Sequence, residues 1–414
     1  GVRVFTSSSS QGLILMSEVL FNIAGMRLPV VLACVNRAVS APLSIWTDHQ
    51  DSMVVRDAGI LQFYSENAQE AADLTYMAYR VAEDHRVLLP AMVCLDGYVI
   101  SHAWEVVDMP EADQVDAFLP PFQPRYRLDP AQPISMGMYA EPDKYLEARY
   151  MVQRAMERSI DIIQEASHDF ERVFGRPCPG LMEEYRTEDA DTVLVAMGSM
   201  AATAKMVVDQ HRDAGEKLGL IKLITYRPFP QKLLYQALKS ASRVVVLDKA
   251  VSLGAQGPLG TEVRSMFLGQ PRPRSVSTFI VGLGGRDVTE SVMDDALKKA
   301  RRGQRTGDQR IFRSSRVADR MRDLLVDGTI MVDLEGEEVG QVNGLAVYSM
   351  GDIFFGKPAR ITANTYMGRP GVVNIEREVK LSGSTHDKSV LILSGYLGRR
   401  FAQNAALAVT ISIA

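Results

Sequence analysis

A continuous apolar run at residues 29–35, PVVLACV, constrains the fold of this chain more than any other stretch. A run without polar alternation is typical of a strand buried on both faces of a parallel sheet. Before it, residues 2–5 predict the end of another strand, Thr6 to Gly12 predict a small-residue loop, and Leu13 to about Ala24 predict an apolar-periodic helix. This order of elements predicts an α/β unit with a parallel sheet covered by helices.

Polar residues follow both of these strands. The loop Ser7–Gln11 precedes the expected helix, and Arg37 stands just beyond the apolar run. Ligands of parallel α/β sheets collect beyond the carboxyl ends of the strands. Serine hydroxyls there can cap a helix or face an anion, and a guanidinium can bind a carboxylate through two parallel hydrogen bonds. Helix capping and an ion pair with a neighbouring acidic residue are the structural alternatives, and the residues alone leave them open.

The alternation of helix and strand continues to about residue 110. We expect an amphipathic helix from Glu66 to Ala82 and a buried strand from Arg86 to Leu95, with Pro90 interrupting it. From Met109 to Asp143 the chain is rich in proline and has little periodicity. This composition predicts an extended connection between domains.

A long helix and a second α/β unit should follow this connection. Lys144–Phe174 predicts one helix that ends at Gly175, a residue suited to a left-handed C-terminal cap. Residues 282–287, GLGGRD, do not complete a GxGxxG dinucleotide motif, so we expect a turn there. The second unit should contain strands at Thr192–Met197, Leu220–Tyr226, Arg243–Asp248 and Thr278–Val281, and helices at about Ala201–Ala214 and Lys232–Leu238.

Composition narrows the class of protein. The formal net charge of −4 gives no reason to propose a nucleic-acid partner. Three widely spaced cysteines, Cys34, Cys94 and Cys178, fit a reducing compartment and exclude a CxxC-type iron–sulfur site in this chain. The chain shows no signal peptide, and no apolar run approaches the ~20 residues of a membrane helix. We therefore expect a cytoplasmic protein with no membrane partner, and its opening inside a strand without Met predicts a fragment.

Several long blocks of the first 300 residues carry a family resemblance. The block SSQGLILMSEVLFNIAGMRLPVVLACVNRAVSAPLSIWTDHQDSM resembles the α-chain region of pyruvate:ferredoxin oxidoreductases. The resemblance continues through FYSENAQEAADL, AEDHRVLLPAMVCLDGYVISH, EEYRTEDADTVLVAMGS, YRPFP, VVVLDKAVSLGAQGPLGTEVRS and VGLGGRDVT. It implies a subunit of an enzyme that decarboxylates a 2-oxo acid, pyruvate first, to an acyl-CoA and passes the electrons to ferredoxin.

The resemblance also implies roles for individual residues. Arg37 would bind the substrate carboxylate, and Asp48, His49 and Asp51 would form an active-site wall. A metal site at these three residues is possible on ligand type, but the resemblance implies wall and packing, so we expect no metal there. The residues expected near the cofactor are Ser8, Ser9, Ser10, Gln11 and Gly12.

The cofactors and partners are likewise implied by the resemblance. Thiamine diphosphate would be shared with a partner domain, whereas Mg²⁺ and iron–sulfur clusters would reside only on partner domains or subunits. The partners would be the other subunits, ferredoxin indirectly, a small 2-oxo acid and coenzyme A. The acid that assists the cofactor and a substrate-holding Thr loop are expected upstream of Gly1, so no catalytic set is complete here and the chain alone should be inactive.

The resemblance gives the expected domain division. The fold class is α/β: a thiamine-diphosphate-binding, pyrimidine-type parallel-sheet domain, then a transketolase C-terminal-like domain expected to be mainly a scaffold, then a partial β-rich module. The expected segments are residues 1–110 for the first domain, 111–182 for the connection and long helix, 183–300 for the second domain, 301–316 for a basic junction and 317–414 for the module.

The last hundred residues resemble a different family. After the basic stretch ARRGQRTGDQRIFRSSR, residues 315–414 resemble the start of the proteolytic domain of Lon-type ATP-dependent proteases. Ser394, Ser412 and Lys388 do not match the Ser–Lys dyad of that family, His386–Lys388 is expected to be a turn, and no Walker A motif occurs. We expect an inactive module in a chimera of two incomplete parts. The alternatives are a junction artefact, a Lon-type protease fragment with a non-catalytic N-terminal scaffold, and a binding module without chemistry.

Overall fold

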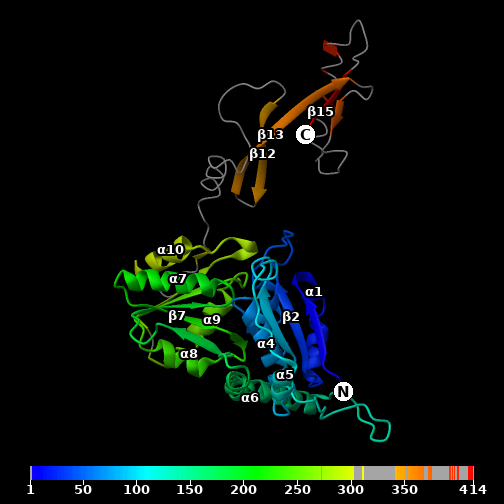
Figure 1. Cartoon of the computed structure of the whole chain (residues 1–414), viewed down its shortest axis with the longest axis vertical. Coiled ribbons are helices and arrows are strands. Elements are labelled where there is room, and N and C mark those ends of the chain that lie inside the picture. Colours follow the sequence, from blue (N-terminus) through cyan, green and yellow to red (C-terminus); the bar gives the residue numbers. More distant parts are fainter. Residues whose placement is uncertain are drawn as a thin grey trace. The chain divides into compact units, whose positions relative to one another are not determined.

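The computed structural model describes residues 2–137, 139–271 and 273–302, together with shorter stretches further on. Those stretches are 310–311, 341–350, 353–367, 372–374, 391–392, 394, 396, 399–400 and 409–413. The chain divides into two compact units, Gly1–Phe312 and Arg313–Ala414 (Figure 1). No helix in the described residues is long and apolar enough to cross a bilayer.

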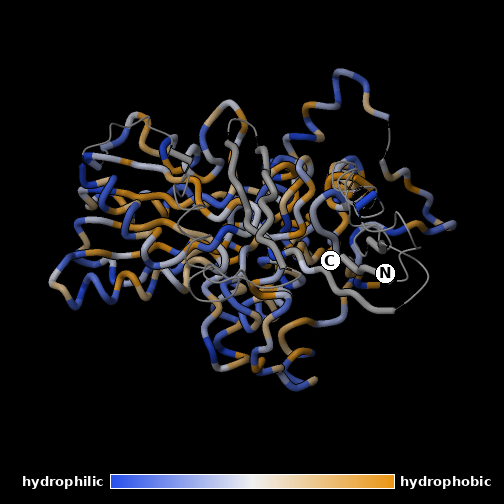
Figure 2. The backbone as a smooth tube through the Cα atoms, turned by 90° about the horizontal axis from the view of Figure 1, so that it is seen from above, coloured by the Kyte–Doolittle hydropathy of each residue, from blue (hydrophilic) through white to orange (hydrophobic). Residues whose placement is uncertain are grey.

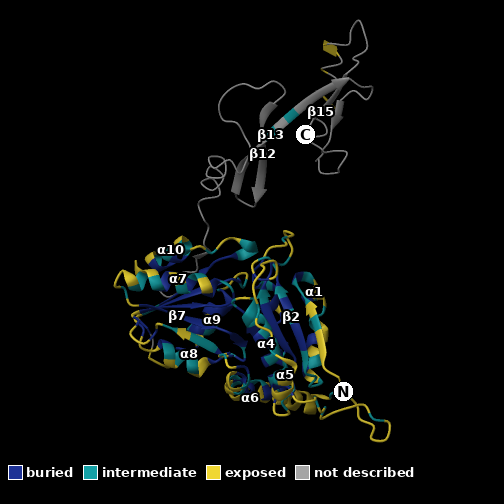
Figure 3. Ribbon diagram, in the orientation of Figure 1, coloured by how far each residue is buried: buried dark blue, intermediate teal, exposed yellow. Residues whose placement is uncertain are grey.

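The first sheet has the strand order β1-β2-β4-β3-β8. Neighbours among the first four strands run parallel, whereas β8 is antiparallel to β3. The expected parallel α/β sheet is therefore confirmed. Figure 3 shows buried central strands and an exposed edge strand β1. The bounds are β1 Val4–Ser8, β2 Val30–Asn36, β3 Leu61–Tyr64, β4 Ala91–Asp96 and β8 Thr225–Arg227.

Helices α4 (Ala68–Ala82), α5 (Ala112–Phe118) and α6 (Pro142–Phe174) share a hydrophobic core with one face of this sheet. The side chain of Asn67 caps α4 by accepting the N–H of Glu70 at 2.9 Å. Helix α6 begins with a proline, whose missing N–H costs nothing in a first turn, and ends at Gly175 with φ of 71°. The expected long helix is confirmed to within two residues of its start.

The second sheet has the order β11-β10-β9-β6-β7-β5. Helices α7 (Met200–Asp213) and α10 (Glu290–Arg301) cover one face. On the other face lie α8 (Gln231–Leu238) and α9 (Pro258–Ser265), in a core cluster that also contains Leu32, Cys34 and Met92 of the first sheet. The two sheets thus pack through one shared core, and Figure 2 shows hydrophobic segments along their strands. The strand bounds are β5 Met182–Tyr185, β6 Thr192–Ala196, β7 Leu218–Leu223, β9 Arg243–Asp248, β10 Ser275–Ile280 and β11 Arg310–Ile311.

The expected loop from Thr6 to Gly12 is wrong. Strand β1 continues through Ser8, and helix α1 (Ser10–Leu15) begins after the single residue Ser9. The expected single helix is two, because the chain turns at Met16 before α2 (Ser17–Gly25).

Three other expectations need correction. The strand expected from Arg86 begins only at Ala91, after Pro90, which has no N–H for a sheet. The expected strand Leu220–Tyr226 is two strands in different sheets, β7 and β8. The proline-rich connection is not extended throughout, since it contains α5.

In the second unit the structure describes four strands in the order β12-β13-β15-β14. Strands β12 (Gln341–Met350) and β13 (Ile353–Met367) form an antiparallel pair. Strand β15 (Val409–Ile413) pairs antiparallel with β13 and parallel with β14 (Val372–Asn374). Most of the basic junction and all of His386–Lys388 lie outside the described residues.

Candidate functional site

The site begins where β1 and β2 end. Two residues beyond the end of β1, Ser10 takes a φ of 50°, in the left-handed region that costs a residue with a Cβ about 1–2 kcal/mol. Two hydrogen bonds hold it there: its N–H donates to Asp51 Oδ2 at 2.8 Å, and its hydroxyl donates to the carbonyl of Ala38 at 2.6 Å. Strained residues of this kind are frequent at functional sites.

Asp51 joins the loops that follow β1 and β2. Besides Ser10, its carboxylate accepts the backbone N–H of Arg37 at 3.0 Å and the side-chain amide of Asn36 at 2.8 Å. Its own neighbour Ser52 donates a fourth hydrogen bond, N–H to Oδ1 at 2.8 Å. Burial raises the pKa of Asp51, and these hydrogen bonds only partly offset the rise. The carboxylate is therefore a fixed point for both loops.

Arg37 lies at this junction with an unpaired side chain. Its Nε is buried and has no hydrogen-bond partner, and its guanidinium makes no ion pair within the described part of the chain. The alternative of an Arg37 that braces Asp48 or Asp51 is thus absent from this structure, because Asp51 accepts the main-chain N–H instead. A buried donor without a partner is costly, and a carboxylate of a ligand would satisfy it.

The other residues expected near the cofactor form the rim of this edge. Ser8, the last residue of β1, and Ser9 are half-buried, and Gly12 is exposed. A Cβ on Gly12 would come within 2.9 Å of Ser8 Oγ, so the turn is tight at this point. Gln11 donates its amide to the hydroxyl of Ser40. The side chains of Ser8, Ser9 and Gln11 are therefore partly exposed at this edge, while Ser10 is fully buried.

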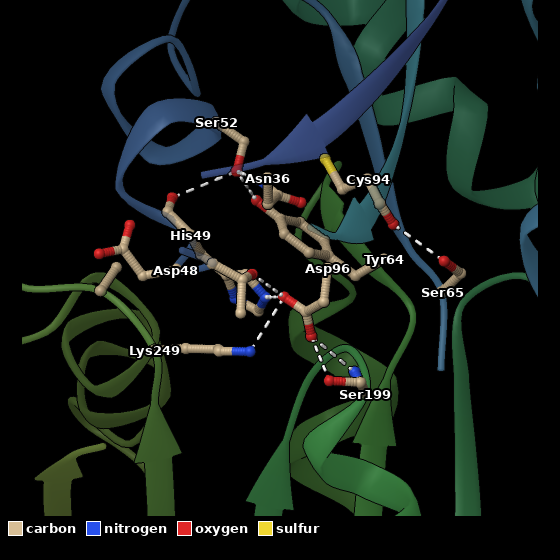
Figure 4. Close-up of polar contacts among 12 residues, drawn as sticks. Asn36, Asp48, His49, Ser52, Tyr64, Ser65, Cys94, Asp96, Ser199 and Lys249 are labelled. Atoms are coloured by element: carbon tan, nitrogen blue, oxygen red, sulfur yellow. Dashed lines mark hydrogen bonds and ion pairs between the residues drawn. The ribbon is translucent and has the colours of Figure 1, made fainter. Parts of the chain in front are cut away.

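A second polar cluster surrounds Asp96, the last residue of β4 (Figure 4). Its Oδ1 accepts the hydroxyl of Thr47 at 2.9 Å and lies 3.1 Å from both His49 Nε2 and Lys249 Nζ. Its Oδ2 accepts the N–H of Ser199 at 3.0 Å and also the Ser199 hydroxyl. Burial acts to raise the pKa of Asp96, but the charge of Lys249, followed by His49, outweighs it and holds the pKa well below the ordinary value.

Asp48 and His49 have different partners from Asp51. Asp48 accepts the N–H of Gly284 at 3.0 Å, and burial raises its pKa. The backbone N–H of His49 donates to the carbonyl of Lys249 at 2.9 Å. In the described part of the chain, no group of three or more His, Cys, Asp or Glu residues could hold a metal ion.

Sequence reasoning missed Asp96, Ser199 and Lys249. Each lies just beyond an apolar run that predicted a strand. Because ligands collect beyond the carboxyl ends of parallel strands, these residues could have been named as candidates in the same way as Arg37. The sequence could not show that they meet, because they come from two different sheets. That meeting depends on the shared core between the sheets.

Two family descriptions match the chain. "Pyruvate flavodoxin/ferredoxin oxidoreductase, thiamine diP-bdg" covers residues 1–168, and "Pyruvate:ferredoxin oxidoreductase core domain II" covers residues 190–293. The two matched ranges contain most strands of both sheets. The matched segments end before residue 315, so the Lon-type resemblance of the C-terminal segment stays a prediction.

Curated relatives match over about three quarters of the chain. The chain is 50% identical over 306 residues to pyruvate synthase subunit PorA of Methanothermobacter thermautotrophicus, covering 74% of this chain and 79% of the relative. It is 47% identical over 308 residues to PorA of Pyrococcus furiosus, covering 74% and 78%. It is 42% identical over 292 residues to ketoisovalerate oxidoreductase subunit VorA of Pyrococcus abyssi, covering 70% and 73%.

A solved structure supports the fold. The 2-oxoglutarate:ferredoxin oxidoreductase from Magnetococcus marinus aligns with a TM-score of 0.52 at 15% identity, covering 72% of this chain and 53% of that one. At this identity the likeness concerns the fold alone. The transketolase-like character expected of residues 183–300 stays a prediction.

Proposed function

Because this chain belongs to the family of pyruvate synthase PorA subunits, we propose that it contributes the substrate-carboxylate site of a thiamine-diphosphate-dependent pyruvate:ferredoxin oxidoreductase. The observation that carries the proposal is the unpaired, buried Nε of Arg37 at the carboxyl end of β2. In the assembled enzyme, pyruvate and coenzyme A are converted to acetyl-CoA and CO₂, and the electrons leave toward ferredoxin.

Arg37 binds the carboxylate of pyruvate in this proposal. A guanidinium suits this task because its planar fork donates two parallel hydrogen bonds and stays charged at any working pH. Asp51 orients it by holding its main chain, and this leaves the side chain available for the substrate. The carboxylate is then fixed while the neighbouring keto carbon is presented to the cofactor.

The rim residues Ser8, Ser9, Gln11 and Gly12 are proposed to face thiamine diphosphate. This cofactor, when bound, supplies the electron sink for decarboxylation, and the protein supplies position and electrostatics. The residues present fit that arrangement, because the rim residues are partly exposed and adjoin Ser10 in the sequence. Asp51 accepts hydrogen bonds from the backbone N–H groups of both Ser10 and Arg37, so it connects the rim to the arginine. We assign the diphosphate site, Mg²⁺ and the iron–sulfur clusters to partner domains or subunits.

Pyruvate is the proposed 2-oxo acid. Arg37 would serve any 2-oxo acid, because all of them carry the same carboxylate. The relatives named pyruvate synthase reach 50% identity, against 42% for a relative named ketoisovalerate oxidoreductase, and this difference favours pyruvate.

The test assembles this chain with the remaining subunits of a pyruvate synthase and measures ferredoxin reduction. Pyruvate should support turnover in the presence of coenzyme A and thiamine diphosphate, with a kcat/KM above that of ketoisovalerate. Equal or better turnover with ketoisovalerate would reassign the substrate. An assembled complex without activity toward any 2-oxo acid would overturn the proposal.

The C-terminal segment has no role in this proposal. Its Lon-type identity, its inactivity and the chimeric join stay predictions, as does the cytoplasmic location. A casein assay on the pure chain checks the predicted inactivity, because degradation inhibited by a serine-directed reagent would show a peptidase site that the sequence did not reveal.

A further inference from the structure

Loops of the second sheet hold residues 47–50, which lie between the two sheets. The carbonyl of Thr47 accepts the N–H of Gly285 at 2.7 Å, and Gln50 Oε1 accepts the N–H of Val251 at 2.5 Å. The bonds of Asp48 with Gly284 and of His49 with the Lys249 carbonyl, described above, add two more. These partners follow β9 and β10, so the carboxyl end of the second sheet sets the position of this segment.

A buried ion pair between Lys249 and Asp96 also joins the two sheets next to residues 47–50. Lys249 is 4% exposed, and its ammonium lies 3.1 Å from Asp96 Oδ1, the oxygen that also accepts Thr47 and contacts His49. Figure 4 shows Lys249 and Ser199 of the second sheet converging on Asp96 of the first. A lone buried carboxylate is strongly disfavoured, and Lys249 supplies a positive charge that helps Asp96 to hold the segment as a charged acceptor.

The segment leads directly to the carboxylate site. Asp51 is the next residue, in helix α3 (Gln50–Val54), and it holds the backbone of Arg37 and of Ser10. Ser52 adds a parallel link, since its hydroxyl donates to the His49 carbonyl at 3.2 Å and accepts from Asn36 at 2.8 Å. A displacement of residues 47–50 is therefore transmitted within one or two residues to the main chain of Arg37.

We propose that Lys249 is a positioning residue for substrate binding, which acts through Asp96 and the 47–51 segment on Arg37. The second domain is then more than a scaffold, because it supplies the charge that orders the substrate arginine of the first domain. This inference rests on the proposed function, since it assigns to Lys249 an influence on the substrate carboxylate.

The central experiment is a mutant cycle in the assembled complex. Lys249→Met should raise the KM for pyruvate and lower kcat/KM about tenfold, which is within the loss expected for Arg37→Ala. In an Arg37→Ala background the same change should have almost no further effect, because both variants remove one interaction. A purely structural role would give the same loss in both backgrounds and would overturn the inference.

Lys205→Met is the matched control. Lys205 on α7 also pairs across the two sheets, with Glu66 at 3.0 Å, but it has no contact with residues 47–51 in the described part of the chain. The Lys205→Met variant should therefore leave the KM for pyruvate unchanged. Binding of pyruvate to the complex without thiamine diphosphate, measured by calorimetry, gives a readout independent of turnover, and Lys249→Met should weaken it about tenfold.

Further outcomes separate a failure of the inference from a failure of the proposed function. If Lys249→Met does not fold, the double variant Asp96→Asn/Lys249→Met avoids an unpaired buried charge and should fold with a raised KM. A folded double variant with the native KM would contradict the inference. If Arg37→Ala itself leaves kcat/KM unchanged, the proposed function fails. If only Lys249→Met is without effect, the inference fails alone.

Discussion

The carboxylate of Asp51 accepts the backbone N–H of Arg37 at 3.0 Å, while the guanidinium of Arg37 makes no ion pair with it. Asp51 therefore fixes the main chain of the arginine, and its guanidinium has no ion pair among the residues that the structure describes. An acidic side chain paired with the guanidinium would compete with a substrate carboxylate. This arrangement therefore favours an Arg37 that binds a substrate carboxylate over an Arg37 that forms an ion pair with Asp51.

Asp51→Asn should test this relationship. The amide keeps one acceptor oxygen but places an NH₂ group against the donors of Ser10 and Arg37 or of Asn36 and Ser52. Leaving buried donors unpaired should lower the free energy of unfolding by about 1–3 kcal/mol. Chemical denaturation measures this loss. Asp57→Asn, at an exposed acid, is the control and should change stability by less than about 0.5 kcal/mol.

Lys222 should be more important for stability than any exposed lysine. It is buried on β7 and pairs with Glu66 at 2.6 Å, Glu183 at 2.8 Å and Glu70 at 2.9 Å. Lys222→Met should lower the free energy of unfolding by about 3–5 kcal/mol, because Glu70 then loses its counter-ion while Glu66 and Glu183 share Lys205 alone.

The pH dependence of this deficit separates charge from packing. At about pH 4.5 the deficit of Lys222→Met should shrink, because protonation removes the uncompensated charges. Thermal melts at pH 7 and 4.5 measure it, with Lys232→Met, at an exposed lysine, as the control. A deficit independent of pH would point to lost packing instead.

The sequence correctly predicted the helices and strands whose residue pattern and end residues are enough to identify them. The helix from Lys144 to Phe174 could be recognised because its helical pattern runs to Gly175, whose φ of 71° a residue without a Cβ adopts at little cost. The strand after Pro29 could be recognised because seven apolar residues in a row fit few other environments.

What the patterns could not predict depends on distant partners. The run Leu220–Tyr226 is mostly apolar, and nothing in it shows that β8 leaves the second sheet to pair with β3. The loop expected at Ser10 is wrong, and the left-handed φ of this residue is held by Asp51, 41 residues later, which no local pattern shows. The ion pair of Asp96 with Lys249 likewise joins two sheets that no local pattern places together.

Asp248 should make stability depend on pH. Burial raises the pKa of this carboxyl to about 6, although the N–H groups of Gly260 and Ala250 donate to it. In the unfolded chain the pKa is about 3.9, so between about pH 4 and 6 the native state keeps a proton that the unfolded state has released. The contribution of Asp248 is therefore most favourable below pH 4 and is lost as the pH rises to 6.

Asp248→Asn should remove this decline. The free energy of unfolding is compared between wild type and Asp248→Asn at pH 4 and at pH 6. The difference between the two proteins should change by about 1–3 kcal/mol over this range. The amide does not titrate, so any cost of the substitution itself is the same at both pH values. Exposed Asp213→Asn is the control, and its difference from wild type should not follow the same curve. A difference for Asp248→Asn that is flat over this range would contradict the assignment.

The most direct test of the account is the kcat/KM of Arg37→Ala for pyruvate in the assembled complex. Losing a charge-assisted contact with the carboxylate should cost about 1.5–3 kcal/mol, which lowers kcat/KM roughly ten- to a hundredfold. Arg37→Lys should recover only part of this loss, because an ammonium keeps the charge without the planar fork. Melting temperature and thiamine diphosphate affinity should change little. An unchanged kcat/KM, or a loss that follows the melting temperature and cofactor affinity, would contradict the account.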